Sequence, residues 1–160
     1  MLKQSHIAKR PFWEHQMEED KAIMLHKTTD LEGNEHIVGA FGIELALDCH
    51  GCDVSRFTRP VIKEYFRDLC KAIDMVRDDL HFWDYEGVPE EEWPTEPHLL
   101  GITATQYIMT SNITIHTLAL IQRAYVNVFS CKPFRDGLVL EVTRKWFKPM
   151  TIGTHRLVRK

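Results

Sequence analysis

The sequence lacks the features that mark several large classes of protein. It has no apolar run long enough to cross a bilayer, and no internal repeat or low-complexity segment. Its charges are nearly balanced, at a net −3, so nothing in its composition points to nucleic acid. The N-terminal segment MLKQSHIAKRPFWEHQMEED has no apolar core of a secretory signal. We therefore predict a cytoplasmic protein that acts on neither membranes nor nucleic acid.

Cysteine is also scarce, and its placement argues against two further classes. The four cysteines, Cys49, Cys52, Cys70 and Cys131, do not form a disulfide framework in a chain of 160 residues. Cys49 and Cys52 form a C-x-x-C pair without the second pair that a zinc site needs, so we interpret them as small apolar residues at a strand end and a turn. The histidines other than His116, which is discussed below, show no metal-ligand spacing such as H-E-x-x-H. The sequence therefore predicts no metal.

The sequence does contain the apolar periodicity of one folded domain. Residues 1–39 are polar and charged, and we interpret them as an N-terminal extension to a domain that spans residues 40–160. Residues 60–77 carry apolar side chains at helical spacing, and residues 138–147 form a second helical segment. Runs typical of strands occupy residues 40–48, 80–85, 99–109, 112–118, 123–130 and 151–158. This order predicts an α+β fold, a two-layer α/β sandwich whose mainly antiparallel sheet has helices on one face.

Three side chains with reactive chemistry lie in or beside the strand-like runs between residues 110 and 131. They are the hydroxyl of Ser111, the imidazole of His116 and the thiol of Cys131. Each alone is more commonly structural than catalytic, but together they supply the nucleophile, base and acid of covalent catalysis. The offset of five residues is odd, so Ser111 and His116 face opposite sides of a regular strand. A bend or bulge between them could bring both into one pocket.

The sequence around these three residues resembles a known family. Residues 101–117, GITATQYIMTSNITIHT, are similar to the self-cleavage region of bacterial and archaeal S-adenosylmethionine decarboxylases. In that family a Glu-Ser-His triplet is followed by an Ile-His-Thr run and then by Val-Phe-Thr-Cys. Ser111, His116 and Cys131 stand at the same offsets in this chain. Residues 47–53, LDCHGCD, also resemble the family's Leu-Asp-x-x-Gly-Cys-Asp segment.

The resemblance implies the two-layer sandwich and a proenzyme that cleaves itself between Thr110 and Ser111. Ser111 would become a pyruvoyl group, which forms a Schiff base with the substrate amine and takes the place of pyridoxal phosphate. By the same resemblance His116 is the processing base, Cys131 the proton donor and Thr103 an assisting hydroxyl. It further implies a homodimer of processed units that decarboxylates S-adenosylmethionine in spermidine biosynthesis.

The sequence departs from the family pattern at positions that bear on function. Thr110 and Asn112 replace a Glu and a His beside the cleavage site, and Leu120 replaces a Glu linked to binding of the ribose hydroxyls. A leucine cannot accept a hydrogen bond from a sugar. Two alternatives therefore stay open: a decarboxylase of ornithine or arginine, and an uncleaved, non-catalytic paralogue that acts as a binding or regulatory subunit. Arg123 is a further candidate, because its guanidinium could hold a substrate carboxylate. The acidic run Glu90–Glu92 is a candidate for attracting a cationic substrate.

Overall fold

The chain divides into two compact units at Gly42. The computed structural model describes residues 25–29, 31–33, 35–39 and 41–159. In the first unit, β1 (Leu25–Thr29) pairs antiparallel with β2 (Glu35–Gly39) to form a hairpin. The second unit, Gly42–Arg159, contains all of the candidate functional residues named from the sequence. Among the described residues, no helix is both long and apolar enough to cross a membrane.

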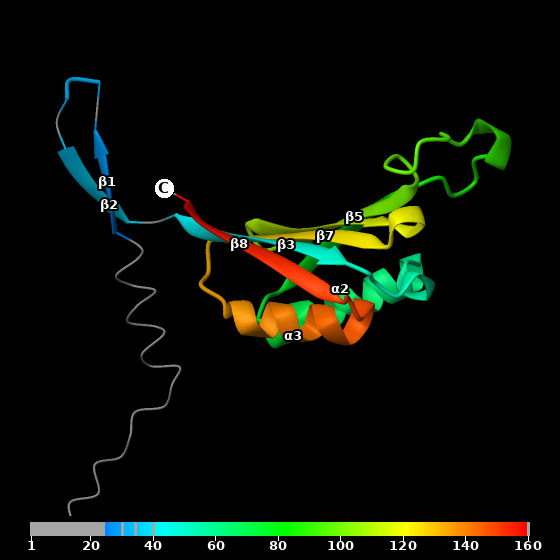
Figure 1. Cartoon of the computed structure of the whole chain (residues 1–160). Coiled ribbons are helices and arrows are strands. Elements are labelled where there is room, and N and C mark those ends of the chain that lie inside the picture. Colours follow the sequence, from blue (N-terminus) through cyan, green and yellow to red (C-terminus); the bar gives the residue numbers. More distant parts are fainter. Residues whose placement is uncertain (1–24, 30, 34, 40, 160) are drawn as a thin grey trace, which may run out of the picture. The chain divides into compact units, whose positions relative to one another are not determined.

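The second unit is built on one six-stranded sheet (Figure 1). Its strands lie in the order β4-β5-β6-β7-β3-β8, and every neighbouring pair is antiparallel. Strands β5, β6 and β7 follow one another along the chain and in space, so short turns are enough to join them. The strands are β3 (Gly42–His50), β4 (Arg77–Trp83), β5 (Gly101–Ile108), β6 (Ser111–Leu118), β7 (Arg123–Ser130) and β8 (Thr151–Arg159).

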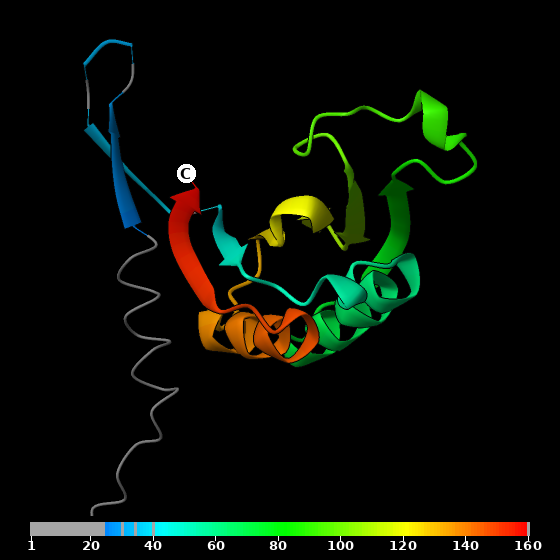
Figure 2. The same cartoon turned by 45° about the vertical axis from the view of Figure 1, so that its right-hand side comes forward.

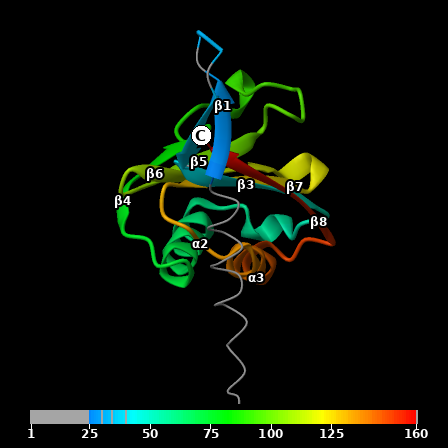
Figure 3. The same cartoon turned by 90° about the vertical axis from the view of Figure 1, so that its left-hand side faces the viewer.

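Two helices, α2 (Arg59–Ala72) and α3 (Asp136–Phe147), lie side by side on one face of this sheet (Figures 2 and 3). The first begins at Thr58, whose hydroxyl accepts a hydrogen bond from the Val61 amide, and it has a proline in its first turn. Both helices bury an apolar stripe against the sheet. The predicted two-layer α+β architecture, an antiparallel sheet with helices on one face, is confirmed.

One helix is shorter than the sequence predicts. The apolar spacing extends over residues 60–77, but α2 ends at Ala72. Asp74 adopts a positive φ of 55°, which reverses the chain and stops the helix. Val76 fits the helical spacing but is 65% exposed, and β4 starts directly after it at Arg77. Val76 therefore lies in the connection between α2 and β4. The apolar periodicity alone could not distinguish it from a residue on the buried face of the helix.

Burial alternates along the central strands and gives the sheet two distinct faces. On the helix-covered face, Ala104, Ile113 and Ile115 are buried in the core. We call the other side the open face, because no helix among residues 41–159 covers it. On β4, β5 and β6 the open face carries Trp83, Thr103, Thr105, Tyr107, Asn112, Thr114 and His116.

The contribution of the core to stability can be tested at Phe147, the last residue of α3. Its side chain is fully buried, and its ring makes an edge contact with Tyr65 of α2 at 4.8 Å between centroids. Replacing Phe147 by alanine is expected to lower the free energy of unfolding by about 3–5 kcal/mol, because a large cavity forms between the helices. Lys71→Ala, on the exposed side of α2, serves as the control and is expected to change it by no more than about 0.5 kcal/mol. Urea denaturation measures both, and equal effects of the two changes would contradict this account of the core.

Candidate active site

The Thr110–Ser111 bond lies at a tight turn between β5 and β6. Met109 and Thr110 form the turn, and Ser111 is the first residue of β6. Thr110 has a positive φ of 61°, an unfavourable conformation for a β-branched residue. Such local strain is stored where the surrounding structure holds it, here by the pairing of Ile108 with Ser111 across the turn. Ser111 is 7% exposed, so its hydroxyl is largely shielded from water.

Cys131 lies directly beside this turn, although it is twenty residues away in the sequence. It follows β7, the neighbour of β6, so antiparallel pairing returns it to the start of β6. Its backbone amide donates to Ser111 Oγ at 3.1 Å, and Ser111 Oγ lies 3.7 Å from Cys131 Sγ. Thr110 Oγ1 lies 3.0 Å from the same sulfur. Hydrogen bonds from Thr110 first and Ser111 second lower the pKa of the Cys131 thiol, which favours its thiolate form.

His116 and Thr103 form a second pair on the open face. They stand opposite each other in the register of β5 and β6, and Thr103 Oγ1 lies 2.7 Å from His116 Nδ1. Burial lowers the pKa of His116, because it disfavours the charged imidazolium. The ring is therefore neutral at pH 7 and able to accept a proton, and this ability is lost as the pH falls through its lowered pKa.

Ser111 and His116 do not meet within one chain. Strand β6 pairs without interruption with both β5 and β7, so it has no bend or bulge between the two residues. Ser111 lies on the helix-covered face and His116 on the open face. At about 3.3 Å per residue, their Cα atoms lie about 16 Å apart. The hypothesis that a bulge joins them in one pocket is wrong for a single chain, because the only register shift recorded in the described sheet is in β4.

Two other positions discussed from the sequence lie away from Ser111. Arg123 opens β7 at the end opposite Ser111, and its Nη1 donates to Tyr125 Oη at 3.3 Å. Leu120 lies in the short 3-10 helix η3 (Ala119–Ile121), where it is 64% exposed and lines an apolar cavity. Nothing brings either side chain into contact with the Ser111–Cys131 group.

The structure also places two acidic residues beside Ser111 that no sequence motif marks. A cavity of about 470 Å³ is lined by Ser111, Thr110, Asp78, Asp79 and His81, together with Ile108 and two open-face residues, Tyr107 and Asn112. The two aspartates lie at the register shift in β4, and Gln106 Nε2 fixes this irregular segment by donating to both of their carbonyl oxygens. The sequence signal for this site is the Asp-Asp pair itself, which follows directly on residues 60–77, where the apolar spacing predicts a helix.

The electrostatics of Cys131 can be tested by alkylation. In a chain held uncleaved by Ser111→Ala, adding Thr110→Val removes the hydroxyl that stabilises the thiolate, so the alkylation midpoint of Cys131 is expected to move to higher pH. The other cysteines are buried, so mass spectrometry can follow this thiol over a pH series with iodoacetamide. Thr114→Val, on the open face of β6, is the matched control and is expected to leave the midpoint unchanged. An unchanged midpoint in Thr110→Val would contradict the assignment.

Comparisons with known proteins agree with the fold and with the family resemblance. The second unit has the architecture of an S-adenosylmethionine decarboxylase: a crystal structure of the adenosylmethionine decarboxylase from Aquifex aeolicus VF5 superposes with a TM-score of 0.60 at 19% identity, covering 75% of this chain and 91% of that one. A family model described as S-adenosylmethionine decarboxylase matches residues 43–160. A search of curated proteins found no match. The chain belongs to the S-adenosylmethionine decarboxylase family, whose defining activity is that of a carboxy-lyase.

Proposed function

We propose that this protein is a pyruvoyl-dependent decarboxylase that activates itself by cleavage between Thr110 and Ser111. The observation that carries the proposal is the position of the Ser111 hydroxyl. It is shielded at a strained turn, accepts a hydrogen bond from the Cys131 amide, and lies within 3.7 Å of the Cys131 thiol. Strain at the bond to be broken and a positioned nucleophile are both requirements of self-cleavage.

The residues at this turn can carry the steps of the cleavage, apart from the removal of one proton by a base. Ser111 Oγ adds to the carbonyl carbon of Thr110, and the peptide C–N bond breaks to leave an ester. Removal of the proton on the Ser111 Cα then breaks the Cβ–Oγ bond and releases Thr110 as a carboxylate. Water replaces the Ser111 nitrogen, which leaves as ammonia. The pyruvoyl group so formed supplies a carbonyl that takes up a substrate amine and draws electrons from the bond to its carboxyl group. Cys131, beside residue 111, can then return a proton to carbon.

We infer that the base comes from a second copy of the chain. His116 cannot reach its own Ser111, so a site that uses both residues is incomplete in one chain. The cavity lined by Ser111 is also lined by His81 and Tyr107, so it is accessible from the open face. The open face carries exposed aromatic residues as well, with Trp83 at 83% and Tyr107 at 48% exposure. Two copies that pack open face to open face would bury these rings and bring the partner's His116 and the partner's Thr103 toward Ser111.

S-adenosylmethionine is the substrate that the family assignment favours. A second candidate is a basic amino acid such as ornithine or arginine, and two observations favour it. Leu120 lines an apolar cavity and offers no acceptor to a ribose. Asp78 and Asp79 border the cavity beside Ser111, where an exposed carboxylate can bind a second ammonium or a guanidinium.

The substrate can be assigned by a side-by-side assay. Freshly purified protein is given carboxyl-labelled S-adenosylmethionine, ornithine or arginine, and the labelled carbon dioxide is counted. We expect turnover of one of these at least about 100-fold above a Ser111→Ala control, because that variant lacks the electron sink. If a basic amino acid is the substrate, the double change Asp78→Asn and Asp79→Asn is expected to lower its turnover at least about tenfold. A fully processed sample that releases no carbon dioxide from any of the three would overturn the proposal.

A further inference from the structure

The edge strand β4 contains one more residue than its pairing with β5 requires. Its register shift lies between Arg77 and Leu80, which are three residues apart but pair with residues of β5 that are only two apart. The two residues inside this interval are Asp78 and Asp79, so the pair of them shares a single position of β5. This is the residue count of a β-bulge, which changes the direction of side chains on the bulged strand.

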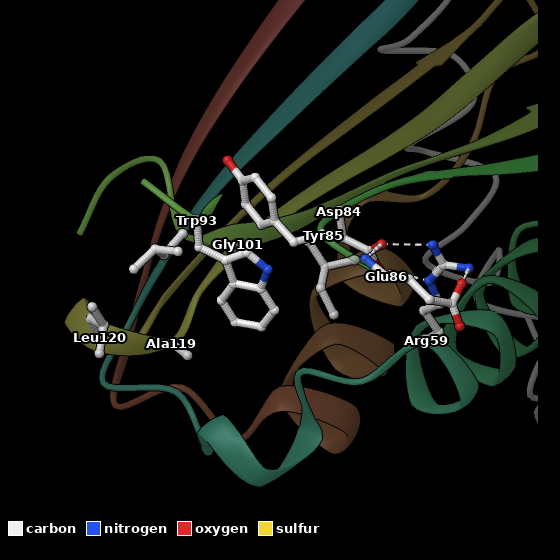
Figure 4. A pocket seen from close by; sticks show the side chains of 10 residues that line it. Arg59, Asp84, Tyr85, Glu86, Trp93, Gly101, Ala119 and Leu120 are labelled. Atoms are coloured by element: carbon white, nitrogen blue, oxygen red, sulfur yellow. Dashed lines mark hydrogen bonds and ion pairs between the residues drawn. The ribbon is translucent and has the colours of Figure 1, made fainter. Parts of the chain in front are cut away.

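The bulge brings both carboxylates to the cavity that contains Ser111. In a regular strand, successive side chains point to opposite faces of the sheet, so only one of Asp78 and Asp79 would face a given cavity. Here both line the cavity of about 470 Å³ beside Ser111, and its described lining residues include no lysine or arginine. This cavity shares no lining residue with the apolar cavity at Leu120 (Figure 4).

One buried side chain, that of Gln106 on β5, holds the bulge in place. It is 1% exposed, and its Nε2 donates to the carbonyl oxygens of Asp78 at 2.8 Å, Asp79 at 3.1 Å and Tyr107 at 2.8 Å. Carbonyl groups of successive residues in a regular strand point in opposite directions, so one nitrogen can reach two of them only where the strand is irregular. These hydrogen bonds therefore favour the bulged form of β4 over a regular one.

The core by itself gives no reason for an amide at this position. The neighbours of Gln106 on the same face of β5 are Ala104 and Ile108, and both are buried apolar residues. Burying an amide among apolar side chains is unfavourable unless its hydrogen bonds are satisfied. The bulge satisfies them, so the amide and the irregular strand depend on each other.

We propose that Gln106 is a positioning residue that holds Asp78 and Asp79 toward the positive charge of the substrate. The inference rests on the proposed decarboxylation at Ser111 and deepens it. It applies to each candidate substrate, because S-adenosylmethionine carries a sulfonium, ornithine a second ammonium and arginine a guanidinium. Each of these cations is separate from the amine that reacts, and each is attracted by carboxylates in the cavity wall. Gln106 acts only through the two aspartates and does not itself contact the substrate.

The test measures KM and kcat for whichever of the three substrates is decarboxylated. Gln106→Met keeps the length of the side chain but removes its three hydrogen bonds. We expect KM to rise at least about tenfold, because the carboxylates lose their common direction, and kcat per cleaved chain to change less than about threefold. Mass spectrometry gives the cleaved fraction, and KM does not depend on that fraction.

Thr143→Val is the matched control for the loss of buried hydrogen bonds. The Thr143 hydroxyl is fully buried between the helices, lies 3.0 Å from Tyr65 Oη and donates to the Val139 carbonyl at 2.7 Å. This change is expected to lower stability but to leave KM unchanged, because the residue is remote from β4. An equal rise of KM in Thr143→Val and Gln106→Met would show a general effect of destabilisation and would overturn the inference.

A double-mutant cycle tests whether Gln106 acts through the aspartates. In a chain that carries Asp78→Asn and Asp79→Asn, adding Gln106→Met is expected to change KM less than about twofold, because no charge is left to position. Gln106→Asn is a milder second variant, and it replaces Gln106→Met in the cycle if that chain does not fold. Its amide is one carbon shorter and cannot reach both carbonyls, so KM is expected to rise at least about threefold.

The outcomes separate this inference from the proposed function. An unchanged KM in the Gln106 variants, or a rise that persists when both aspartates are replaced, would overturn the positioning role and leave the decarboxylase intact. A wild-type chain that releases no carbon dioxide would overturn the proposed function, and the role of Gln106 with it.

Discussion

Ser111→Ala is expected to leave the chain as a single full-length species, with no cleavage even after long incubation. The wild-type protein is expected to yield two fragments, residues 1–110 and a pyruvoyl-capped 111–160. The reason is chemical, because alanine has no hydroxyl to attack the Thr110 carbonyl, and the hydroxyl of Thr110 itself could reach that carbon only by closing a strained four-membered ring. Mass spectrometry of the intact chains under denaturing conditions distinguishes the two outcomes directly.

Ser130→Ala is the matched control for this change. Ser130 is also a buried serine, 1% exposed, and it lies next to Cys131 at the end of β7. Cleavage is expected to continue in Ser130→Ala, which separates loss of the nucleophile from a general disturbance of the turn. A wild-type chain that stays at full length would contradict self-cleavage, and would instead support the alternative of an uncleaved binding or regulatory subunit.

Mixing two inactive variants is expected to restore activity. Ser111→Ala and His116→Ala are each expected to be inactive alone. In a mixed dimer, one of the two sites combines the intact Ser111 of one chain with the intact His116 of the other. Random pairing then gives about a quarter of the wild-type decarboxylation, because half of the dimers are mixed and each has one complete site. Co-expression followed by intact mass also identifies the cleaved chain, which is expected to be the His116→Ala chain.

The control mixes Ser111→Ala with Cys131→Ala. These two residues act together in one chain, since Cys131 N and Ser111 Oγ are 3.1 Å apart, so mixed dimers contain no complete site and remain inactive. Mixed dimers of Ser111→Ala and His116→Ala that form but stay inactive would show that the base does not come from the partner.

Most of the fold could be predicted from local patterns. The alternation of apolar residues located the strands, and the apolar stripes located both helices, because these periods follow from backbone geometry alone. One exception was the end of α2, where Val76 continues the helical spacing after Asp74 has already turned the chain. The acidic pair after it, Asp78 and Asp79, therefore lies at the irregular start of β4 and not after a helix end, which only the structure shows. Another exception was the β1–β2 hairpin, which lies within the residues interpreted as a polar extension.

The sequence by itself determined the family, the two-layer architecture and the chemistry available at Ser111, His116 and Cys131, because these depend on residue types at fixed offsets. Only the tertiary structure decided which of these residues meet. The register of β6 against β7 brings Cys131 to Ser111, and the unbroken pleat of β6 turns His116 to the opposite face. Strand pairing is set by contacts between segments far apart in the chain, and a one-residue slip would exchange the two faces. The odd offset places Ser111 and His116 on opposite sides of a regular strand, but only the unbroken pairing of β6 with both neighbours excludes the bulge that could have brought the base to the nucleophile.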